Sequence, residues 1–277
     1  VLMYPTIASF FELLIFVTVM LPPLFFTSLY LPIITPMPEL SINIVRLKLK
    51  IMFFPIGDDQ VHGGHKPLLS YALILINTFV FLYEFSLTPG ESEVFINHFG
   101  AIPNEIIYGH DISTLLYSMF LHGGWMHLIG NMLFLWVFAD NIEAVIGTFN
   151  FLIFYVAGGL VASAVHIFFN PHSDIPMVGA SGAISAALGA YLVMFPASRI
   201  KVFFLLFFSV FYIPAIFFLG IWIIQQLVAG LGSINSAAEE ATNVAWWAHV
   251  GGFVFGVLAG FLMRSQYKSR YVYRSEQ

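Results

Sequence analysis

Long apolar runs separated by short polar segments dominate the sequence from residue 67 onward. A helix that crosses a bilayer needs about 20 predominantly apolar residues. Runs of that size recur with at most one charged side chain each, and they predict six membrane-spanning helices, near residues 67–86, 124–142, 148–169, 178–196, 202–226 and 244–263. A seventh candidate, from Phe10 to Leu31, carries Glu12 and the pair Pro22-Pro23, which disrupts a regular helix.

The composition agrees with a polytopic, all-α membrane protein. Of the 277 residues, 59% are hydrophobic and only 9% are charged, whereas soluble domains carry about 25% charged residues. A chain so poor in charge cannot cover itself with a polar surface, so we expect the lipid bilayer to surround it. The absence of cysteine excludes thiol catalysis and disulfides. No basic cluster is large enough to predict a nucleic-acid partner.

The basic residues predict the orientation of the chain. The ten Lys and Arg residues are Arg46, Lys48, Lys50, Lys66, Arg199, Lys201, Arg264, Lys268, Arg270 and Arg274. With six spans after Lys66 all ten fall on one side, and the opposite loops, near 87–123, 170–177 and 227–243, contain none. Basic loops stay in the cytoplasm, so both ends of the core should be cytoplasmic, and we expect the cell (plasma or inner) membrane.

The same reading divides the chain into three parts. Residues 52–264 form a six-span core, and residues 265–277 form a short basic cytoplasmic tail. Residues 1–51 are an N-terminal extension or an extra membrane anchor. The loop 87–123 is long for a membrane bundle and rich in apolar residues, so we expect a partly buried lobe on the outer face.

Four polar residues on three predicted spans should lie at one depth. His127 and Asn131 fall in the first two turns of the second span, Ser181 in the first turn of the fourth, and His249 about five residues into the sixth. Each of these spans begins on the outer side, which places the four side chains about 5–10 Å below the outer surface. Polar groups at such depth are costly and are usually functional or paired.

These residue types suit acyl transfer. A serine hydroxyl is a poor nucleophile until a neighbouring base takes its proton, and histidine titrates in the useful range. His127 and Asn131 are four residues apart and share a helix face, so their N–H groups and the backbone N–H of Ser181 form a candidate oxyanion site. We expect no metal or other cofactor, because His62 and His65 alone do not complete a zinc site.

Small residues would let the fourth and sixth spans approach closely. They recur every four positions, as Ser181, Ser185 and Gly189 on one span and Gly252, Gly256 and Gly260 on the other. Such stripes allow helix backbones to come together in membranes. We group Gly179 and Gly182 with Gly252 and Gly256 as packing glycines, with Gly179 also a flexible approach to its helix.

Other classes of function stay open on the residues alone. A lone membrane serine usually bonds back to its own helix, and buried His and Asn side chains also line ion paths in transporters. An ion path should cross the bilayer, whereas this cluster stops near the outer third. A non-catalytic binder of membrane helices is a further alternative, and the oligomeric state is not predicted.

Three segments resemble the signatures of rhomboid intramembrane serine proteases: "LHGGWMHLIGNM", "GASGAISAALGAY" and "AHVGGFVFG". The resemblance covers Met52 to Arg264. It implies that Ser181 is the nucleophile, that His249 is the general base and acid, and that His127 and Asn131 are the oxyanion donors. It also implies helix contacts at Gly252 and Gly256. Rhomboid proteases cleave transmembrane segments of other membrane proteins near the outer bilayer boundary with a Ser–His dyad, so single-span substrates are expected.

Two features depart from the family. An aromatic residue commonly follows the nucleophile by one turn and packs against the histidine, but Ser185 stands there, so another group must orient His249. A Trp-Arg pair common in the first loop is also missing. The fifth predicted span, "VFFLLFFSVFYIPAIFFLGIW", contains Pro214 and large side chains, and we interpret it as a lateral gate beside the second span.

Overall fold

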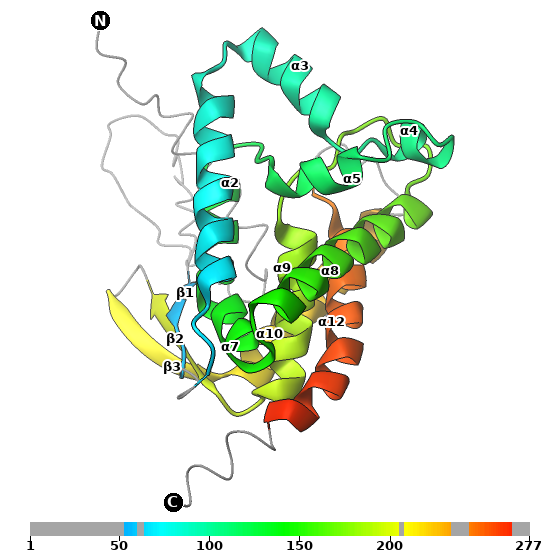
Figure 1. Ribbon diagram of the computed structural model, residues 1–277. Coiled ribbons are helices and arrows are strands. Elements are labelled where there is room, and N and C mark those ends of the chain that lie inside the picture. The colour runs from blue at the N-terminus through cyan, green and yellow to red at the C-terminus, as the bar shows by residue number, and fades with distance from the viewer. Residues whose placement is uncertain (1–52, 60–63, 205–207, 234–243, 268–277) are drawn as a thin grey trace, which may run out of the picture.

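The computed structural model describes residues 53–59, 64–204, 208–233 and 244–267, which form a helical bundle with a small sheet at one end (Figure 1). The candidate helix Phe10–Leu31, the N-terminal extension and most of the basic tail lie outside these residues. The helices are α2 (Leu68–Ser86), α3 (Pro89–Phe99), α4 (Pro103–Ile107), α5 (Thr114–Tyr117), η2 (Ser118–Phe120), α6 (Trp125–Phe134), η3 (Leu135–Ala139), α7 (Asp140–Ile146), α8 (Thr148–Phe169), α9 (Ser181–Met194), α10 (Ala215–Ser233) and α12 (Trp246–Tyr267).

Five helical segments of the described chain are long and apolar enough to cross a membrane. They are α2, the continuous stretch of α6, η3 and α7, then α8, α10 and α12. The prediction of a polytopic, all-α membrane protein is therefore confirmed. The second span runs on to Ile146, beyond its predicted end at residue 142, and η3 is a π-helical turn inside it.

The fourth predicted span is a shorter helix than the pattern suggests. Helix α9 has 14 residues, Ser181–Met194, which span about 21 Å and fall short of the bilayer core. Most of its residues are buried, including Tyr191 at 0% exposed, and in Figure 1 it lies among α8, α10 and α12. A short central helix places its first residue, Ser181, inside the bundle.

The fifth predicted span is wrong in its first half. Residues 202–204 are the end of strand β2 (Arg199–Phe204), residues 209–214 form strand β3 (Ser209–Pro214), and the helix begins only at Ala215. With β1 (Phe53–Gly57) they form an antiparallel sheet in the order β1-β2-β3. Buried side chains of β2 alternate with exposed or half-buried ones, which is a strand period, but the apolar run that begins at residue 202 hides the end of this alternation from a hydrophobicity count.

The loop 87–123 forms the predicted lobe beyond one end of the bundle. It contains α3, α4, α5 and η2, and the first three of these are the upper helices in Figure 1. Helix α3 has no buried residue, whereas Ser118 and Met119 of η2 are buried. A β-bridge between Ala101 and Met177, and a hydrogen bond from the N–H of Gly179 to the carbonyl oxygen of Ser118, tie the lobe to the segment that leads into α9. The lobe is therefore partly buried and borders the start of α9.

Glycines allow α9 and α12 to touch through their backbones. A Cβ added at Gly252 would lie 2.2 Å from the carbonyl oxygen of Gly182, and one at Gly256 would lie 1.9 Å from that of Ala186. On α9, a Cβ at Gly189 would lie 2.1 Å from the carbonyl oxygen of Phe253. No side chain fits at these distances, so the two helix axes are held closer than larger residues would permit.

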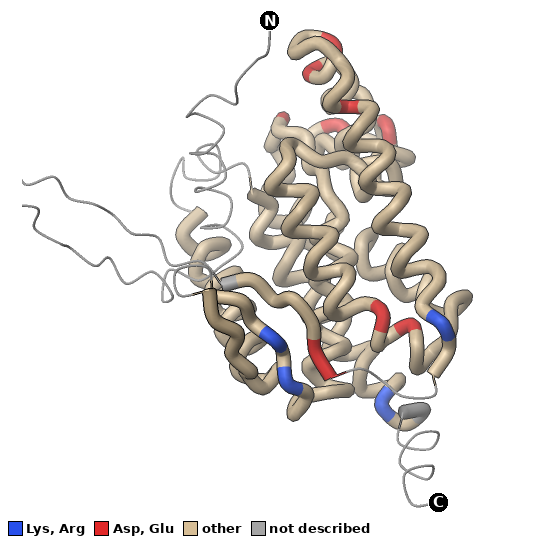
Figure 2. Tube along the Cα trace, turned by 90° about the vertical axis from the view of Figure 1, so that its left-hand side faces the viewer, with Lys and Arg blue, Asp and Glu red and all other residues tan. Residues whose placement is uncertain are grey.

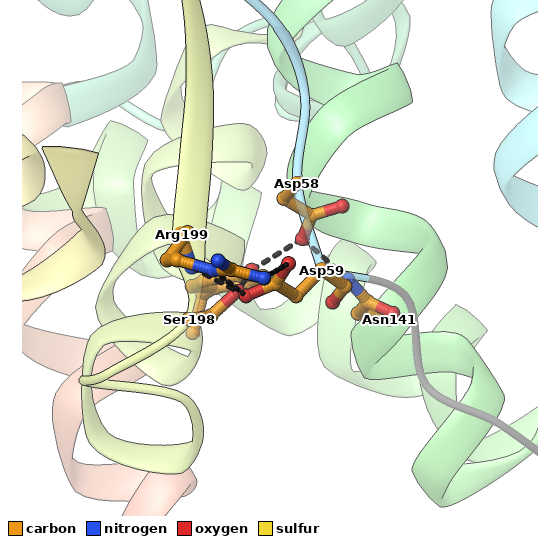
Figure 3. A network of polar contacts seen from close by, with 6 residues as sticks. Asp58, Asp59, Asn141, Ser198 and Arg199 are labelled. Carbon is orange, nitrogen blue, oxygen red and sulfur yellow. Dashed lines mark hydrogen bonds and ion pairs between the residues drawn. The ribbon is translucent and has the colours of Figure 1, made fainter. Parts of the chain in front are cut away.

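Charged residues are divided between the two ends of the bundle. Figure 2 shows the described Lys and Arg residues at the end that carries the sheet, with Asp and Glu at both ends. At the sheet end, Asp58 accepts hydrogen bonds from Tyr191 of α9 and Asn141 of α7 (Figure 3). The neighbouring Asp59 pairs with Arg199 at 3.1 Å. These contacts fasten the chain after β1 to the first turn of α7, the last turn of α9 and the start of β2.

Candidate active site

The first residue of α9 and the first turns of α12 meet at the lobe end of the bundle. The Oγ atom of Ser181 lies 2.9 Å from Nε2 of His249, although the two residues are 68 positions apart. His249 is 4% exposed. The close backbone contact of Gly252 with Gly182 fixes this approach, because each glycine is three residues or fewer from one of the two side chains. The structure thus brings together the predicted serine and histidine.

The second ring nitrogen of His249 also has a partner. Nδ1 lies 2.8 Å from Oε1 of Gln226 on α10. The rings of Trp222 and Trp246 have their centroids 6.0 Å and 6.3 Å from that of His249. The sequence analysis did not select Gln226. Its amide side chain stands out in an apolar segment, but the sequence does not show which residue it faces.

Ser185 does not take part in orienting His249. Its Oγ donates a hydrogen bond to the backbone carbonyl oxygen of Ser181 at 2.6 Å, and its side chain is 1% exposed. This is the back-bonding that serine commonly adopts within helices. The aromatic neighbours of His249 come instead from α10 and α12.

His127 and Asn131 lie on one face of α6, beside the backbone that enters α9. The backbone N–H of Gly123 donates to Nδ1 of His127 at 3.4 Å. Neutral imidazole carries one hydrogen, so an Nδ1 that accepts leaves the hydrogen on Nε2. A Cβ at Gly179 would lie 2.6 Å from this Nε2 and 3.4 Å from Nδ2 of Asn131. Both donors therefore converge just before Ser181.

Gly179 has a different place from the other glycines of the motif. It precedes α9 rather than lying in a helix–helix contact, and its φ of +119° is one that residues with a side chain rarely adopt. Its missing Cβ leaves room for the two donor side chains. Gly179 thus lies against side chains of α6, whereas Gly182 packs against α8, with its Cβ position 2.7 Å from Cβ of Ala162.

His122 is a further polar residue at this site that the sequence reading did not single out. Its Nδ1 lies 3.3 Å from the carbonyl oxygen of Phe120, and its Nε2 lies 3.1 Å from Nδ2 of Asn131. The first contact requires hydrogen on Nδ1, so Nε2 accepts from one N–H of Asn131 and the second N–H stays available. Burial lowers the pKa of His122 to about 3, which keeps this neutral arrangement at physiological pH.

The backbone before α6 is held by α2. The N–H of His122 donates to the carboxylate of Glu84, at 3.1 Å and 3.3 Å from its two oxygens, and both residues are buried. Glu84 interrupts the apolar pattern of the first span, which was its only signal in the sequence. It fixes the segment that presents His122 to Asn131.

The fold and the geometry define a multi-pass membrane protein whose helices bring a serine–histidine pair beside two side-chain donors. A family model described as the Rhomboid domain matches residues 109–266. The chain belongs to the rhomboid family. The match includes all four side chains of the candidate site.

Curated relatives resemble the chain over half of its length or more. "Rhomboid protease GluP" of Bacillus subtilis is 30% identical over 203 residues, which are 73% of this chain and 36% of the relative. "Rhomboid protein 1, mitochondrial" of Saccharomyces cerevisiae is 31% identical, over 53% of this chain and 41% of the relative. "Presenilin-associated rhomboid-like protein A, mitochondrial" of Danio rerio is 30% identical, over 52% and 35%. The chain thus spans less than half the length of these relatives.

Proposed function

We propose that this chain is an intramembrane serine endopeptidase that cleaves transmembrane segments of membrane proteins. The observation that carries the proposal is the 2.9 Å contact between Ser181 Oγ and His249 Nε2 inside a membrane bundle. A serine whose hydroxyl faces a base is the minimum apparatus for nucleophilic catalysis. The Bacillus relative that is named a protease supports the same reaction.

The reaction follows from the two side chains. Ser181 Oγ bonds to the carbonyl carbon of the substrate while its proton passes to His249 Nε2. The C–N bond then breaks, and His249 returns the proton to the leaving amine. Water next attacks the acyl-serine ester, giving one proton to His249, and the proton goes back to Oγ as the ester bond breaks. The products are a free amine and a carboxylic acid.

The donors beside Gly179 suit the negative charge of the tetrahedral intermediate. His127 Nε2–H, one N–H of Asn131 and the backbone N–H of Ser181 at the start of α9 are the candidate groups. Donors that are already oriented stabilise an oxyanion without reorganisation, and losing one typically costs about 3 kcal/mol of transition-state stabilisation. These groups give the site a means of favouring the transition state over the substrate.

The substrates we propose are single-span membrane proteins, cut near the outer boundary of the bilayer. A regular helix hides its amides in hydrogen bonds, so Gly or Pro near the cut should ease the unwinding that exposes a carbonyl carbon. The distribution of basic residues supports a site that opens outward, with both ends of the core in the cytoplasm of a cell membrane. Two of the relatives are named as mitochondrial, so family membership by itself does not assign the membrane.

Helix α10 is the proposed lateral gate, now beginning at Ala215 rather than at residue 202. Its Phe218 ring lies 6.4 Å from that of Phe134 on α6 and 6.2 Å from that of Phe138 on η3. These aromatic contacts are the ones that a substrate helix entering between α10 and the second span would have to separate.

A second candidate function is a non-catalytic binder of membrane helices on the same bundle. The hydrogen bond between Ser181 and His249 favours catalysis, because binding alone needs no activated hydroxyl. A transporter has less support, because an ion path should cross the bilayer, whereas the polar groups of this site lie together near the start of α9.

A fluorophosphonate probe tests the proposal. We expect the probe to label the wild-type protein in detergent, with no labelling of Ser181→Ala and slow labelling of His249→Ala. Retained native unfolding behaviour of both variants is the control. Labelling of Ser181→Ala at the wild-type rate, or no labelling of wild type, would contradict the assignment of the nucleophile.

A further inference from the structure

One face of α10 packs against α12 beside the candidate site. Trp222, Gln226 and Gly230 are four residues apart and share that face. A Cβ at Gly230 would lie 3.2 Å from the ring of Trp247. The ring of Trp222 is tilted relative to that of His249, and their centroids are 6.0 Å apart. Gln226 therefore lies on the face of α10 that contacts Trp247 and His249 of α12.

The amide sets which nitrogen of His249 carries its hydrogen. Oε1 of Gln226 lies 2.8 Å from Nδ1, and a carbonyl oxygen only accepts, so Nδ1–H donates to it. The lone pair of Nε2 then faces Ser181 Oγ at 2.9 Å. This tautomer is the one that can take the serine proton. With the amide reversed, its NH₂ would face Nδ1, and the hydrogen on Nε2 would block that step.

We propose that Gln226 is a positioning residue of the catalytic site, which fixes the tautomer and the ring orientation of His249. It is 1% exposed, and among the described residues its side chain makes no hydrogen bond with Ser181, His127 or Asn131. A neutral amide behind the histidine replaces the aromatic packing that Ser185 cannot supply. Cysteine proteases of the papain type use an asparagine in an equivalent role. The inference rests on the proposed function of Ser181 and His249.

Other groups around His249 do not offer the same contact. Within the described part of the chain, His249 makes no hydrogen bond or ion pair with a carboxylate. The titratable side chains that interact with it electrostatically are His127 of α6 and His166 of α8. Both are cationic when charged, so neither stabilises an imidazolium. Gln226 Oε1 is therefore the acceptor that meets the ring as His249 gains a proton.

Replacing the amide by an apolar side chain of similar size tests the role. In Gln226→Met, kcat for a single-span reporter in detergent should fall at least about tenfold, within the roughly 10²–10⁴-fold that a general base supplies. KM should stay unchanged, because Gln226 does not face the substrate. The matched control is Gln225→Met, the same change one position earlier on α10, which should keep kcat within about twofold.

A second variant gives a readout that packing alone would not move. Gln226→Glu keeps an acceptor for Nδ1–H and adds negative charge, which favours the protonated ring. Part of the lost kcat should return, and the acidic limb of the kcat profile should move to higher pH. Thermal unfolding of each variant in the same detergent is the folding control.

The outcomes separate the two proposals. An inactive wild type refutes the proposed function itself. An active wild type with Gln226→Met indistinguishable from Gln225→Met overturns the role of Gln226 and leaves Ser181 and His249 standing. If Gln226→Met does not fold, Gln226→Glu decides, and a pH profile identical to wild type overturns the role.

Discussion

At the scale of single residues, the room beside Gly179 controls the candidate oxyanion site. The backbone there has a φ of +119°, and the position of a Cβ is already taken by the His127 ring, 2.6 Å away. A side chain at residue 179 would meet both a strained backbone conformation and the imidazole. The site therefore depends on the absence of a side chain next to Ser181.

Gly179→Ala should lower activity by about 100-fold, the effect of losing one oxyanion donor. The added methyl group would push His127 away from the carbonyl oxygen of the substrate. The measurement is kcat/KM for reporter cleavage, and Gly220→Ala on α10 is the control because nothing lies within 4 Å of its Cβ position. Equal activity of the two alanine variants would show that His127 is not a donor.

The chemistry-bearing residues differed in how far the sequence could predict them. Ser181, His249, His127 and Asn131 stand out because they are polar at one depth in apolar spans, and the structure brings them together. Gln226 is equally polar, but it acts through a contact on another helix that no spacing along the chain reveals. His122 lies before the first residue of α6, so helix periodicity does not predict which way its side chain points.

At the scale of elements, the contact between α9 and α12 sets the distance between the proposed nucleophile and its base. Their backbones meet at Gly252, Gly256 and Gly189. The small-residue stripes predicted this contact correctly, because a four-residue period puts such residues on one helix face. Any increase in the separation of the two helices would lengthen the Ser181–His249 contact.

Gly256→Ala should destabilise the protein by about 1–3 kcal/mol, the usual cost of overpacking. Its Cβ would lie 1.9 Å from a backbone oxygen of α9, which cannot rotate away. The free energy of unfolding in mixed micelles measures the effect, and fluorophosphonate labelling should slow in parallel. Leu258→Ala, at a side chain 64% exposed on the same helix, is the control. Wild-type stability of Gly256→Ala would contradict the close contact.

The misplaced fifth span shows the limit of hydrophobicity at this scale. Residues 202–226 carry no charge and are mostly apolar, so length and composition favour one long helix. The backbone of 202–204 instead pairs with β1 on one side and with β3, residues 209–214, on the other. β1 lies about 150 residues earlier in the chain, and a pairing of that range cannot be read from a local pattern.

At the scale of the whole molecule, the charge distribution predicts which end faces the cytoplasm. The described basic residues gather at the sheet end, and the lobe end carries acidic residues (Figure 2). The chain contains no cysteine, so single cysteines can report exposure without background. The candidate site lies toward the lobe end, so the orientation of the protein in the membrane decides on which side the proposed cleavage would take place.

Single-cysteine labelling in intact cells should distinguish the two ends. Glu93→Cys in α3 should react with a membrane-impermeant maleimide from outside, whereas Lys201→Cys in β2 should react only after permeabilisation, as positive-inside loops require. Both variants must retain fluorophosphonate labelling to count. The reverse pattern of labelling would refute the proposed orientation.

The two adjacent aspartates at the sheet end should differ in their effect on stability. Asp58→Ala removes a buried acceptor from both Tyr191 and Asn141 and should cost about 1–3 kcal/mol. Asp59→Ala removes an exposed ion pair with Arg199, worth about 0–1 kcal/mol. Unfolding of both variants in mixed micelles at neutral pH measures the difference, and equal losses would contradict the network drawn in Figure 3.

The contribution of Asp59 should also depend on pH. The hydrogen bond from the Arg199 side chain lowers the pKa of Asp59 below its usual value. A carboxylate with a lowered folded-state pKa adds stability above its unfolded pKa and loses it as pH falls through the folded value. The small difference between wild type and Asp59→Ala should therefore vanish in acid, and a difference that grew in acid would contradict this sign.

Cleavage of a membrane substrate by the reconstituted protein is the direct test of the proposed serine–histidine protease. The protein is placed in liposomes with a single-span reporter that carries Gly residues in the outer part of its helix, and mass spectrometry locates the cut bond. We expect one cut in the outer part of the reporter helix, with the rate of cleavage at least about 10³-fold lower for Ser181→Ala and for His249→Ala. Cleavage by Ser181→Ala at the wild-type rate would contradict it.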